Sequence, residues 1–287
     1  YTAAICLHYG GNDWSTSQQK GLEDTFGELG IEIVAVTDAN FSAETQVSNI
    51  ETVMAKKPDI LVSIPTDATA TADAYKQAAA AGIKIIFMDQ RANGLEAGKD
   101  YVSVVSADNY GNGYASGTVL GDALGGKGKV AMVYYDANFA PTNQRDEGFR
   151  DAMKNYPDIE IVTEQGFTDE SGCAEQGDAI LTQFPNIDGI YASWDVPMEG
   201  VLSAVRAAGM EGKVTLACND LGNNVAREIA SGNIAGGGAQ MPYDQGVAEA
   251  KLAALALLGE ETPSYVAVPA ETFTHENVLE AYTDVYH

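Results

Sequence analysis

The chain has 287 residues, of which 45% are apolar and 20% charged, a composition typical of globular proteins and a length that allows two domains of ordinary size. Asp and Glu number 41 against 16 Lys and Arg, which gives a net charge of −25. Such an acidic surface repels phosphate backbones and anionic lipid, so it disfavours binding to nucleic acid or to a membrane surface.

Membrane spans, disulfides and metal sites are also disfavoured. No apolar run approaches the ~20 residues of a transmembrane helix. The chain opens directly on the apolar run TAAICLHY, so we expect that any secretory leader has been removed. The odd number of cysteines argues against a disulfide framework: Cys6 and Cys218 lie inside apolar runs and are expected in the core, whereas Cys173 falls on a predicted polar helix. The three histidines are scattered, and no cofactor or metal is expected.

The first part of the chain alternates between apolar runs and helical patterns. The expected strands are residues 2–9, 31–36, 59–64, 83–88 and 101–105, and the expected helices are residues 14–29, 42–56 and 68–81. Gly30 is a C-cap signal and Ser42 a plausible N-cap. This alternation predicts a parallel sheet with right-handed crossovers.

The pattern restarts after residue 108. Helices are expected over residues 109–124, 142–155, 171–184 and 196–208, and strands over 129–135, 159–164, 187–192 and 213–218. In both parts, a strand, an Ala-rich helix and a glycine precede a second strand that ends in an acid, Asp89 or Asp220. The repeat suggests a weak internal duplication; the alternative is that any two β/α units look alike.

Residues after 233 do not continue a simple tandem. A strand over 234–239, a helix over 243–258 and an extended segment over 264–273 are expected. A helix that crosses back would make both lobes discontinuous, with residues 1–106 and 241–267 in one and 107–240 and 268–287 in the other. Three crossings near residues 104–108, 239–242 and 266–270 would join them, an arrangement that allows hinge closure while limiting twist.

The run GIKIIFMD, residues 82–89, indicates a buried parallel strand that ends at Asp89. In open α/β sheets, ligands bind at the carboxyl ends of the strands, so Asp89 is a candidate ligand-binding residue. The alternative is a loop acid that caps the next turn.

Several short motifs occur together in one order along the chain. The motifs are Asn12-Asp13-Trp14, Ile64-Pro65-Thr66-Asp67, Phe87-Met88-Asp89, Ser106-Ala107-Asp108-Asn109 followed by Gly113, Arg145-Asp146-Glu147-Gly148-Phe149, Ser193-Trp194-Asp195, Asn219-Asp220 and Gln240-Met241-Pro242. On these motifs the chain resembles the type I periplasmic sugar-binding proteins that feed ABC transporters, and within them the ribose-binding-like branch.

The resemblance implies two doubly wound parallel-sheet lobes joined by a three-segment hinge, with a sugar site in the cleft. A sugar offers C–H faces to aromatic rings and rim hydroxyls to charged or amide groups. The implied ligand-binding residues are aromatic rings, acids, amides and an arginine: Asn12, Trp14, Asp89, Gln90, Arg145, Phe167, Trp194, Asn219, Asp220 and Gln240.

The implied roles divide by chemistry. The family places a stacking ring at Trp14 and another at Phe167, and Asp89 and Asp220 would accept from hydroxyls in opposite lobes. Arg145 would bridge two oxygens with its planar donor fork. For three of these residues a structural alternative remains: a surface Trp at a helix start, a packing Phe, and an ordinary exposed helix Arg.

The chain departs from the ribose-binding pattern at four positions. Ile64 and Trp194 stand where that branch has Asn, Gln90 stands where it has Arg, with Arg91 next, and Ser15 replaces an aromatic residue. Trp194 could replace hydrogen bonds with ring coverage. These departures put ribose itself in doubt and favour a sugar or sugar alcohol of another shape.

The resemblance implies a non-enzymatic substrate-binding protein of an ABC importer. Its expected partners are a monosaccharide or polyol and the permease subunits; a monomer is expected. The expected location is the periplasm, or the outside of a Gram-positive cell with a lipid anchor. The alternatives are the same fold binding a sugar alcohol, nucleoside or furanosyl signal molecule, and, less favoured, the effector domain of a LacI-type repressor.

Two observations weigh against the non-transport alternatives. A repressor needs a helix-turn-helix and a basic face, whereas this chain starts on a strand with a net charge of −25. An enzyme on a doubly wound fold would show a nucleotide-binding glycine motif or a nucleophile elbow, and neither is present. The glycine-rich segment 125–128 precedes a strand, the wrong order for a phosphate cradle.

Overall fold

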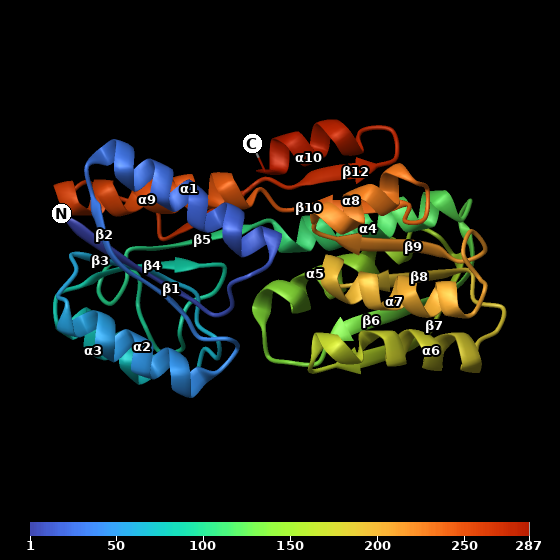
Figure 1. The fold of residues 1–287 in the computed structure, drawn as a ribbon, viewed down its shortest axis with the longest axis horizontal. Coiled ribbons are helices and arrows are strands. Elements are labelled where there is room, and N and C mark those ends of the chain that lie inside the picture. The colour runs from blue at the N-terminus through green and yellow to red at the C-terminus, as the bar shows by residue number, and fades with distance from the viewer. Residues whose placement is uncertain (287) are drawn as a thin grey trace. The chain divides into compact units, whose positions relative to one another are not determined.

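Two six-stranded sheets organise the chain, one in each of two units (Figure 1). The computed structural model describes residues 1–286. Unit 1 contains residues 1–107 and 241–268, and unit 2 contains residues 108–240 and the tail from Pro269. The chain therefore passes between the units three times, after Ala107, after Gln240 and after Val268. Below, these passages are called the first, second and third crossings.

The sheet of unit 1 has the order β11-β5-β4-β3-β1-β2 and is parallel throughout. Helices α2 and α3 cover one face, and α1 and α9 cover the other (Figure 1). The strands are β1 Thr2–Leu7, β2 Glu32–Asp38, β3 Ile60–Ser63, β4 Lys84–Met88, β5 Ser103–Ala107 and β11 Tyr265–Val268, and the helices are α1 Asp13–Leu29, α2 Ala43–Ala55, α3 Ala72–Ala80 and α9 Pro242–Leu258.

The sheet of unit 2 has the order β12-β10-β9-β8-β6-β7, and only β12 runs antiparallel to its neighbour among the strands that the structure describes. Helices α4 and α5 pack together, as do α6 and α7, while α10 packs near β12 and α8. The strands are β6 Lys127–Tyr135, β7 Asp158–Phe167, β8 Gly189–Ala192, β9 Thr215–Asn219, β10 Gly236–Ala239 and β12 Glu271–Thr274. The helices are α4 Asn109–Ala123, α5 Ala140–Met153, α6 Cys173–Gln183, α7 Asp195–Ala207, α8 Asn223–Ala230 and α10 Val278–Tyr286, with the 3-10 turn η1 Glu170–Gly172.

The predicted duplication is confirmed, because the two sheets have the same strand order. β3 and β4 occupy the places in unit 1 that β8 and β9 occupy in unit 2, as the paired motifs predicted. The equivalence extends to the backbone: Asp89 directly follows β4 and Asp220 directly follows β9, and both are in the left-handed region, with φ of 52° and 64°. Strands β4 and β9 are therefore each followed by a residue with the same left-handed backbone conformation.

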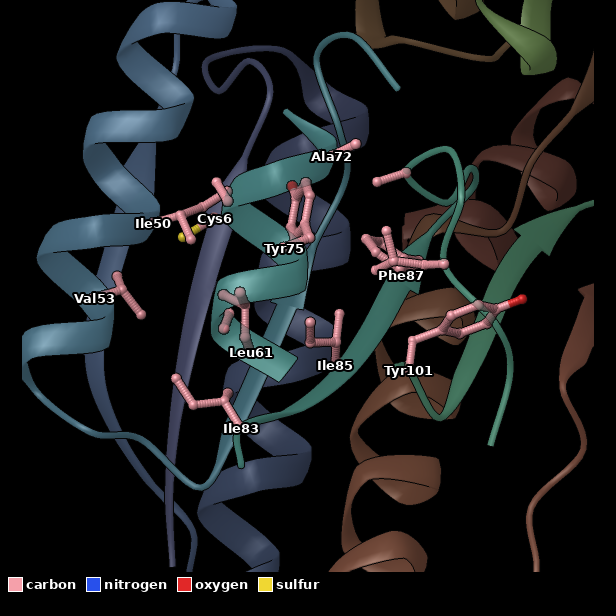
Figure 2. Close-up of a cluster of buried hydrophobic side chains, with 14 of the residues drawn as sticks. Cys6, Ile50, Val53, Leu61, Ala72, Tyr75, Ile83, Ile85, Phe87 and Tyr101 are labelled. Atoms are coloured by element: carbon pink, nitrogen blue, oxygen red, sulfur yellow. The ribbon is translucent and has the colours of Figure 1, made fainter. Parts of the chain in front are cut away.

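One core cluster of unit 1 lies between the sheet and helices α2 and α3 (Figure 2). Tyr75 of α3 packs edge-on against Phe87 of β4, with ring centroids 5.0 Å apart, and Phe87 packs in the same way against Tyr101 at 5.3 Å. Cys6 is part of this cluster, and Cys218 is equally buried in unit 2, so both are core residues as predicted. Burying one large apolar side chain contributes roughly 1.5–3 kcal/mol, so clusters of this kind fix the strand ends.

Most predicted elements are confirmed, including the Gly30 cap, at φ of 68°, and the Ser42 cap, which accepts from the Thr45 N–H. The helix predicted over 68–81 begins only at Ala72, because the Asp67 carboxylate accepts from the N–H groups of Thr69 and Ala70 and holds a turn there. The strand predicted over 159–164 continues to residue 167. Helix α8 was not predicted.

Two helix pairs approach so closely that only glycine fits between them. In unit 1, a Cβ on Gly246 of α9 would lie 2.2 Å from the Gln18 carbonyl oxygen of α1, and one on Gly21 would lie 2.2 Å from the Tyr243 carbonyl oxygen. In unit 2, a Cβ on Gly113 of α4 would lie 1.8 Å from the Arg145 carbonyl oxygen of α5. These close approaches fix the positions of the side chains that flank them.

Across residues 1–286, every helix is too short or too polar to span a bilayer.

Candidate functional site

Unit 2 contains a buried ion pair between Arg145 and Asp220. Arg145 of α5 donates from Nη1 to Oδ2 of Asp220 over 2.8 Å. The Arg145 side chain is 5% exposed and that of Asp220 12% exposed, so water screens the pair weakly. Arg145 is therefore not the ordinary exposed helix Arg of the alternative reading. Removing one partner from such a pair leaves a buried charge without compensation.

Neighbouring amides and carbonyls satisfy the rest of this ion pair. Gln240 donates to Oδ1 of Asp220 over 3.0 Å, and Arg145 Nε donates to Oδ1 of Asn109 over 2.9 Å. Arg145 Nη1 also donates to the Ser193 carbonyl oxygen over 3.2 Å. Gln240, Arg145 and Asp220 thus form one hydrogen-bonded group at the ends of β10 and β9 and on α5, with the donors and acceptors that hydroxyl groups need.

Asn219 serves the interior of unit 2. It is fully buried, donates to the Tyr191 hydroxyl over 2.8 Å and to the Ser193 carbonyl over 3.1 Å, and accepts from the Ser116 hydroxyl over 2.7 Å. These bonds tie β9 to β8 and α4 directly beneath Asp220. We therefore infer that Asn219 helps to hold the backbone of Asp220 in place.

A second buried carboxyl group lies beside this ion pair. Asp146 accepts from the Ser193 hydroxyl over 2.6 Å, and burial raises the pKa of Asp146 to about 6. Asp195, the first residue of α7, accepts from the Gly222 N–H over 3.0 Å. Burial, and then the nearby charge of Asp220, raises the pKa of Asp195 to about 8. At pH 7, Asp195 is therefore mostly protonated, whereas Asp146 is mostly ionised.

Aromatic rings form a cluster at the carboxyl ends of β6, β7 and β8. Phe167 and Trp194 lie 5.1 Å apart between ring centroids, and Tyr135 lies 5.6 Å from each. Trp194 Nε1 donates to Oε1 of Glu170 over 2.9 Å, which fixes the indole. Burial raises the pKa of Glu170. Phe167 is buried, in line with the packing alternative, whereas the half-buried Tyr135 and Trp194 can offer ring faces to C–H surfaces.

In unit 1, Asp89 is held by two side chains. Its Oδ1 accepts from the Ser106 hydroxyl over 3.0 Å and from Gln245 Nε2 over 3.2 Å. Its N–H donates to the Val105 carbonyl over 2.7 Å, so β5 fixes the backbone at the strand end. Asp89 is partly exposed.

Two further candidates lie at the start of α1. Asn12 is the N-cap, and its Oδ1 accepts from the Ser15 N–H over 2.8 Å. Trp14 packs edge-on against His8, with centroids 5.9 Å apart, and its Nε1 is buried with no hydrogen-bond partner in unit 1 as described. Burial lowers the pKa of His8 to about 4, so this ring is neutral at pH 7. Trp14 is thus half-buried against His8 and is not the free surface Trp of the alternative reading.

Gln90 faces the body of unit 1. It is buried, and its Nε2 donates to the Pro65 carbonyl oxygen over 2.8 Å, which ties the ends of β3 and β4 together. Arg91 donates from Nη1 to the Leu95 carbonyl oxygen over 3.0 Å. The Gln90 side chain, a predicted ligand-binding group, thus donates a hydrogen bond to the backbone of its own unit.

A second buried polar group fills the seam between α1 and α9. Gln18 Nε2 donates to Oε1 of Glu249 over 2.6 Å, and both side chains are fully buried. Burial, and then the charge of Asp89, raises the pKa of Glu249 well above its usual range. Glu249 is therefore a proton-bearing acid beside the Asp89 group.

The structure brings together the predicted residues Arg145, Asp220 and Gln240 by hydrogen bonds, and Phe167 and Trp194 by ring contact. The side-chain hydrogen bonds described above for Asn12, Gln90 and Asn219 join groups of the same unit. Sequence reasoning assigned no role to Ser106, Asn109, Gln245, Tyr135 or Glu170. Ser106 and Asn109 lay within one of the quoted motifs, whereas Gln245 had no signal beyond a polar residue in an Ala-rich helix.

The chain is similar in sequence to known binding proteins. The model of the periplasmic binding protein domain matches residues 3–261 of the chain. The ribose import binding protein of Salmonella typhimurium is 25% identical over 260 residues, which cover 91% of this chain and 86% of that protein.

Two solved structures agree closely with the fold. A periplasmic solute-binding protein of an ABC transporter from Actinobacillus succinogenes, with bound D-allose, has a TM-score of 0.89 and 29% identity and covers 97% of this chain and 99% of its own. A solute-binding protein of an ABC transporter from Agrobacterium vitis, with bound α-D-tagatopyranose, has a TM-score of 0.92 and 26% identity and covers 100% of this chain and 99% of its own. With its two duplicated α/β units and three crossings, the chain belongs to the periplasmic binding protein family.

Proposed function

We propose that this chain is the substrate-binding protein of an ABC importer and that it captures a monosaccharide or a closely related polyol for a membrane permease. The observation that carries the proposal is the buried group of Arg145, Asp220 and Gln240 beside the ring cluster of Tyr135, Phe167 and Trp194. It combines charged hydrogen-bonding groups with aromatic faces, as sugar recognition requires. The protein's task is binding and delivery, without a chemical step.

Asp89 of unit 1 has the same place after its strand as Asp220 of unit 2. We propose that both carboxylates accept hydrogen bonds from hydroxyls of one ligand molecule, and that binding it favours a closed arrangement of the hinge, which the permease recognises. Micromolar affinity corresponds to roughly 8 kcal/mol. Hydrogen bonds to charged groups contribute about 1.5–3 kcal/mol each, so a few of them with one or two ring contacts suffice.

The ring cluster argues for a ligand other than ribose. Trp194 stands where the ribose-binding branch has an amide, and Glu170 fixes its indole. Its neighbours are Phe167 and Tyr135. Phe167 is buried, whereas Tyr135 and Trp194 are half-buried. Two partly exposed rings favour a ligand with a larger apolar face, such as a hexose, a deoxy sugar or a nucleoside. The second candidate function is therefore a nucleoside- or furanoside-binding protein of the same family.

The relatives are extracytoplasmic proteins by family, and we propose the same location for this chain, either in the periplasm or outside the cell with a lipid anchor. We propose that it acts as a monomer. Size-exclusion chromatography with light scattering, with and without ligand, tests the monomer.

A thermal-shift panel tests the function, using protein that has been unfolded and then refolded. Refolding removes any sugar that copurifies and so leaves the site available. The panel includes D-ribose, D-allose, D-tagatose, D-arabinose, D-xylose, myo-inositol and nucleosides. A ligand at 100 times its dissociation constant adds about 2.7 kcal/mol, which raises the midpoint by roughly 5–10 °C for a chain of this size. A shift confined to one stereochemical group of sugars supports the proposal; a shift with nucleosides alone supports the second candidate.

A further inference from the structure

We propose that Ser106, Asn109 and Gln245 are positioning residues that tie the charged ligand-binding groups to the first and second crossings. The inference deepens the proposed function and rests on it. It concerns side chains that no feature of the sequence had assigned to the site. Each of them lies within a few residues of a crossing and is bonded to a charged group of its own unit.

The first crossing, between Ala107 and Asp108, has such a residue on each side. Ser106 precedes it, and its hydroxyl donates to Oδ1 of Asp89 over 3.0 Å. Asn109 follows it as the first residue of α4, and its Oδ1 accepts from Nε of Arg145 over 2.9 Å. The two ends of this crossing are thus bonded to the charged groups of unit 1 and unit 2 respectively.

The second crossing, between Gln240 and Met241, repeats the arrangement in the opposite direction. Gln240 precedes it and donates to Oδ1 of Asp220 over 3.0 Å. Gln245 follows it in the first turn of α9, and its Nε2 donates to Oδ1 of Asp89 over 3.2 Å. Asp89 therefore takes one bond from each crossing, and so does the Arg145–Asp220 pair.

The helices that follow these crossings are held tightly in place. Gly246, next to Gln245, lies against the Gln18 carbonyl oxygen of α1, and Gly113, one turn after Asn109, lies against the Arg145 carbonyl oxygen of α5. Gln245 is fully buried, and Asn109 is 1% exposed, so neither side chain has room for many rotamers. A shift in the path of a crossing consequently moves the group that holds the charged side chain.

Coupling of this kind is reciprocal. If the path of the crossings sets the orientation of Asp89 and Arg145, a ligand that fixes these groups favours one path of the crossings by the same free energy. Loss of a positioning residue should therefore weaken ligand binding more than it weakens the fold. A purely structural role predicts the reverse.

The test uses the full chain and the sugar of the panel that binds wild type most tightly. Gln245→Met keeps the length of the side chain and removes the donor to Asp89. We expect its dissociation constant, measured by isothermal titration calorimetry, to rise about 10-fold or more. Gln18→Met is the matched control, because Gln18 is equally buried in the α1–α9 seam and donates to Glu249 in place of Asp89. We expect it to lower the melting temperature without ligand and to leave the affinity within about 3-fold of wild type.

A second pair of variants tests the other unit. Asn109→Leu removes the acceptor for Arg145 Nε and should weaken binding, whereas Asn109→Asp keeps an acceptor there and should restore most of the affinity. Wild-type affinity in both Gln245→Met and Asn109→Leu, in protein shown by circular dichroism to be folded, would overturn the inference while leaving the proposed function intact. A wild type that binds no compound of the panel would overturn both.

Discussion

Asp89 and Asp220 carry the same unusual backbone conformation at equivalent strand ends. A positive φ is rare for residues other than glycine, although Asp and Asn tolerate it better than most. Here it occurs directly after β4 and after β9, at φ of 52° and 64°. The left-handed turn directs each carboxylate toward partners on neighbouring elements: Ser106 and Gln245 in one unit, and Arg145 and Gln240 in the other.

Arg145 is the residue whose loss should affect both binding and stability. Arg145→Met removes the partner of Asp220 from a buried site, and breaking such a pair is expected to lower the free energy of unfolding by about 3–5 kcal/mol. Urea unfolding of the ligand-free protein measures this change.

Arg150 of the same helix provides the control. It pairs with Glu164 on the surface, where both side chains are more than a third exposed (37% and 36%). Because water and salt screen such pairs, Arg150→Met should lower the free energy of unfolding by about 1 kcal/mol or less. Equal losses in the two variants would contradict the account of Arg145 as a buried ion-pair partner.

At the scale of elements, glycines at the helix contacts allow the close approach of the helices that carry candidate site residues. Gly246→Ala should push α9 away from α1, because its Cβ would lie 2.2 Å from the Gln18 carbonyl oxygen, a backbone atom. Overpacking of this kind lowers the free energy of unfolding by about 1–3 kcal/mol. Thermal unfolding of the ligand-free protein measures the loss.

Gly27→Ala in α1 is the matched control, since a Cβ there meets nothing within 4 Å. Alanine favours the helix over glycine by up to about 1 kcal/mol, so this variant should be more stable than wild type. A stabilising Gly246→Ala would show that the α1–α9 seam has room that the close approach excludes.

The α1–α9 seam also predicts a pH dependence. Glu249 is buried against Gln18 and near Asp89, and its pKa is raised well above the usual range, chiefly by burial. The folded chain therefore keeps this proton at pH values where the unfolded chain has lost it. Its contribution to stability is complete below the unfolded pKa of about 4.3 and declines as the pH rises toward the folded pKa.

Glu249→Gln removes this titration and keeps the shape of the side chain. We expect the variant to unfold at higher urea concentration than wild type at pH 8, and the difference between pH 5 and pH 8 to be smaller in the variant. Asp195, with a pKa raised to about 8, acts in the same direction and remains in both proteins. An unchanged difference between the two pH values would contradict a buried, proton-bearing Glu249.

Sequence patterns predicted elements well where periodicity and caps agreed. The strands and helices around Gly30, Ser42 and Asp89 were confirmed, because a buried parallel strand has few alternatives. Helix α8 was missed because it has only eight residues, and the helix predicted from residue 68 starts late because of a side-chain bond from Asp67. Gln245 and Glu170 could not be assigned, since their partners are distant in sequence and known only from the fold.

At the scale of the whole molecule, the chain contains a duplicated α/β unit and passes between its two copies three times. β11 adds to the sheet of unit 1, and β12 adds to that of unit 2, so both sheets reach six strands with the same order. Two of the crossings carry polar residues bonded to charged groups on both sides. The duplication thus supplies an equivalent carboxylate at the same strand end of each sheet, Asp89 and Asp220, and we propose both as acceptors for ligand hydroxyls.

The measurement that tests this most directly is calorimetric titration of the best sugar into wild type, Asp89→Asn and Asp220→Asn. Asn tolerates the left-handed backbone of both positions and removes only the charge. The account predicts one site per chain and a dissociation constant about 10- to 150-fold higher in each variant, the effect of losing a charged hydrogen-bond acceptor. Wild-type affinity in either folded variant, or two independent sites per chain, would contradict it.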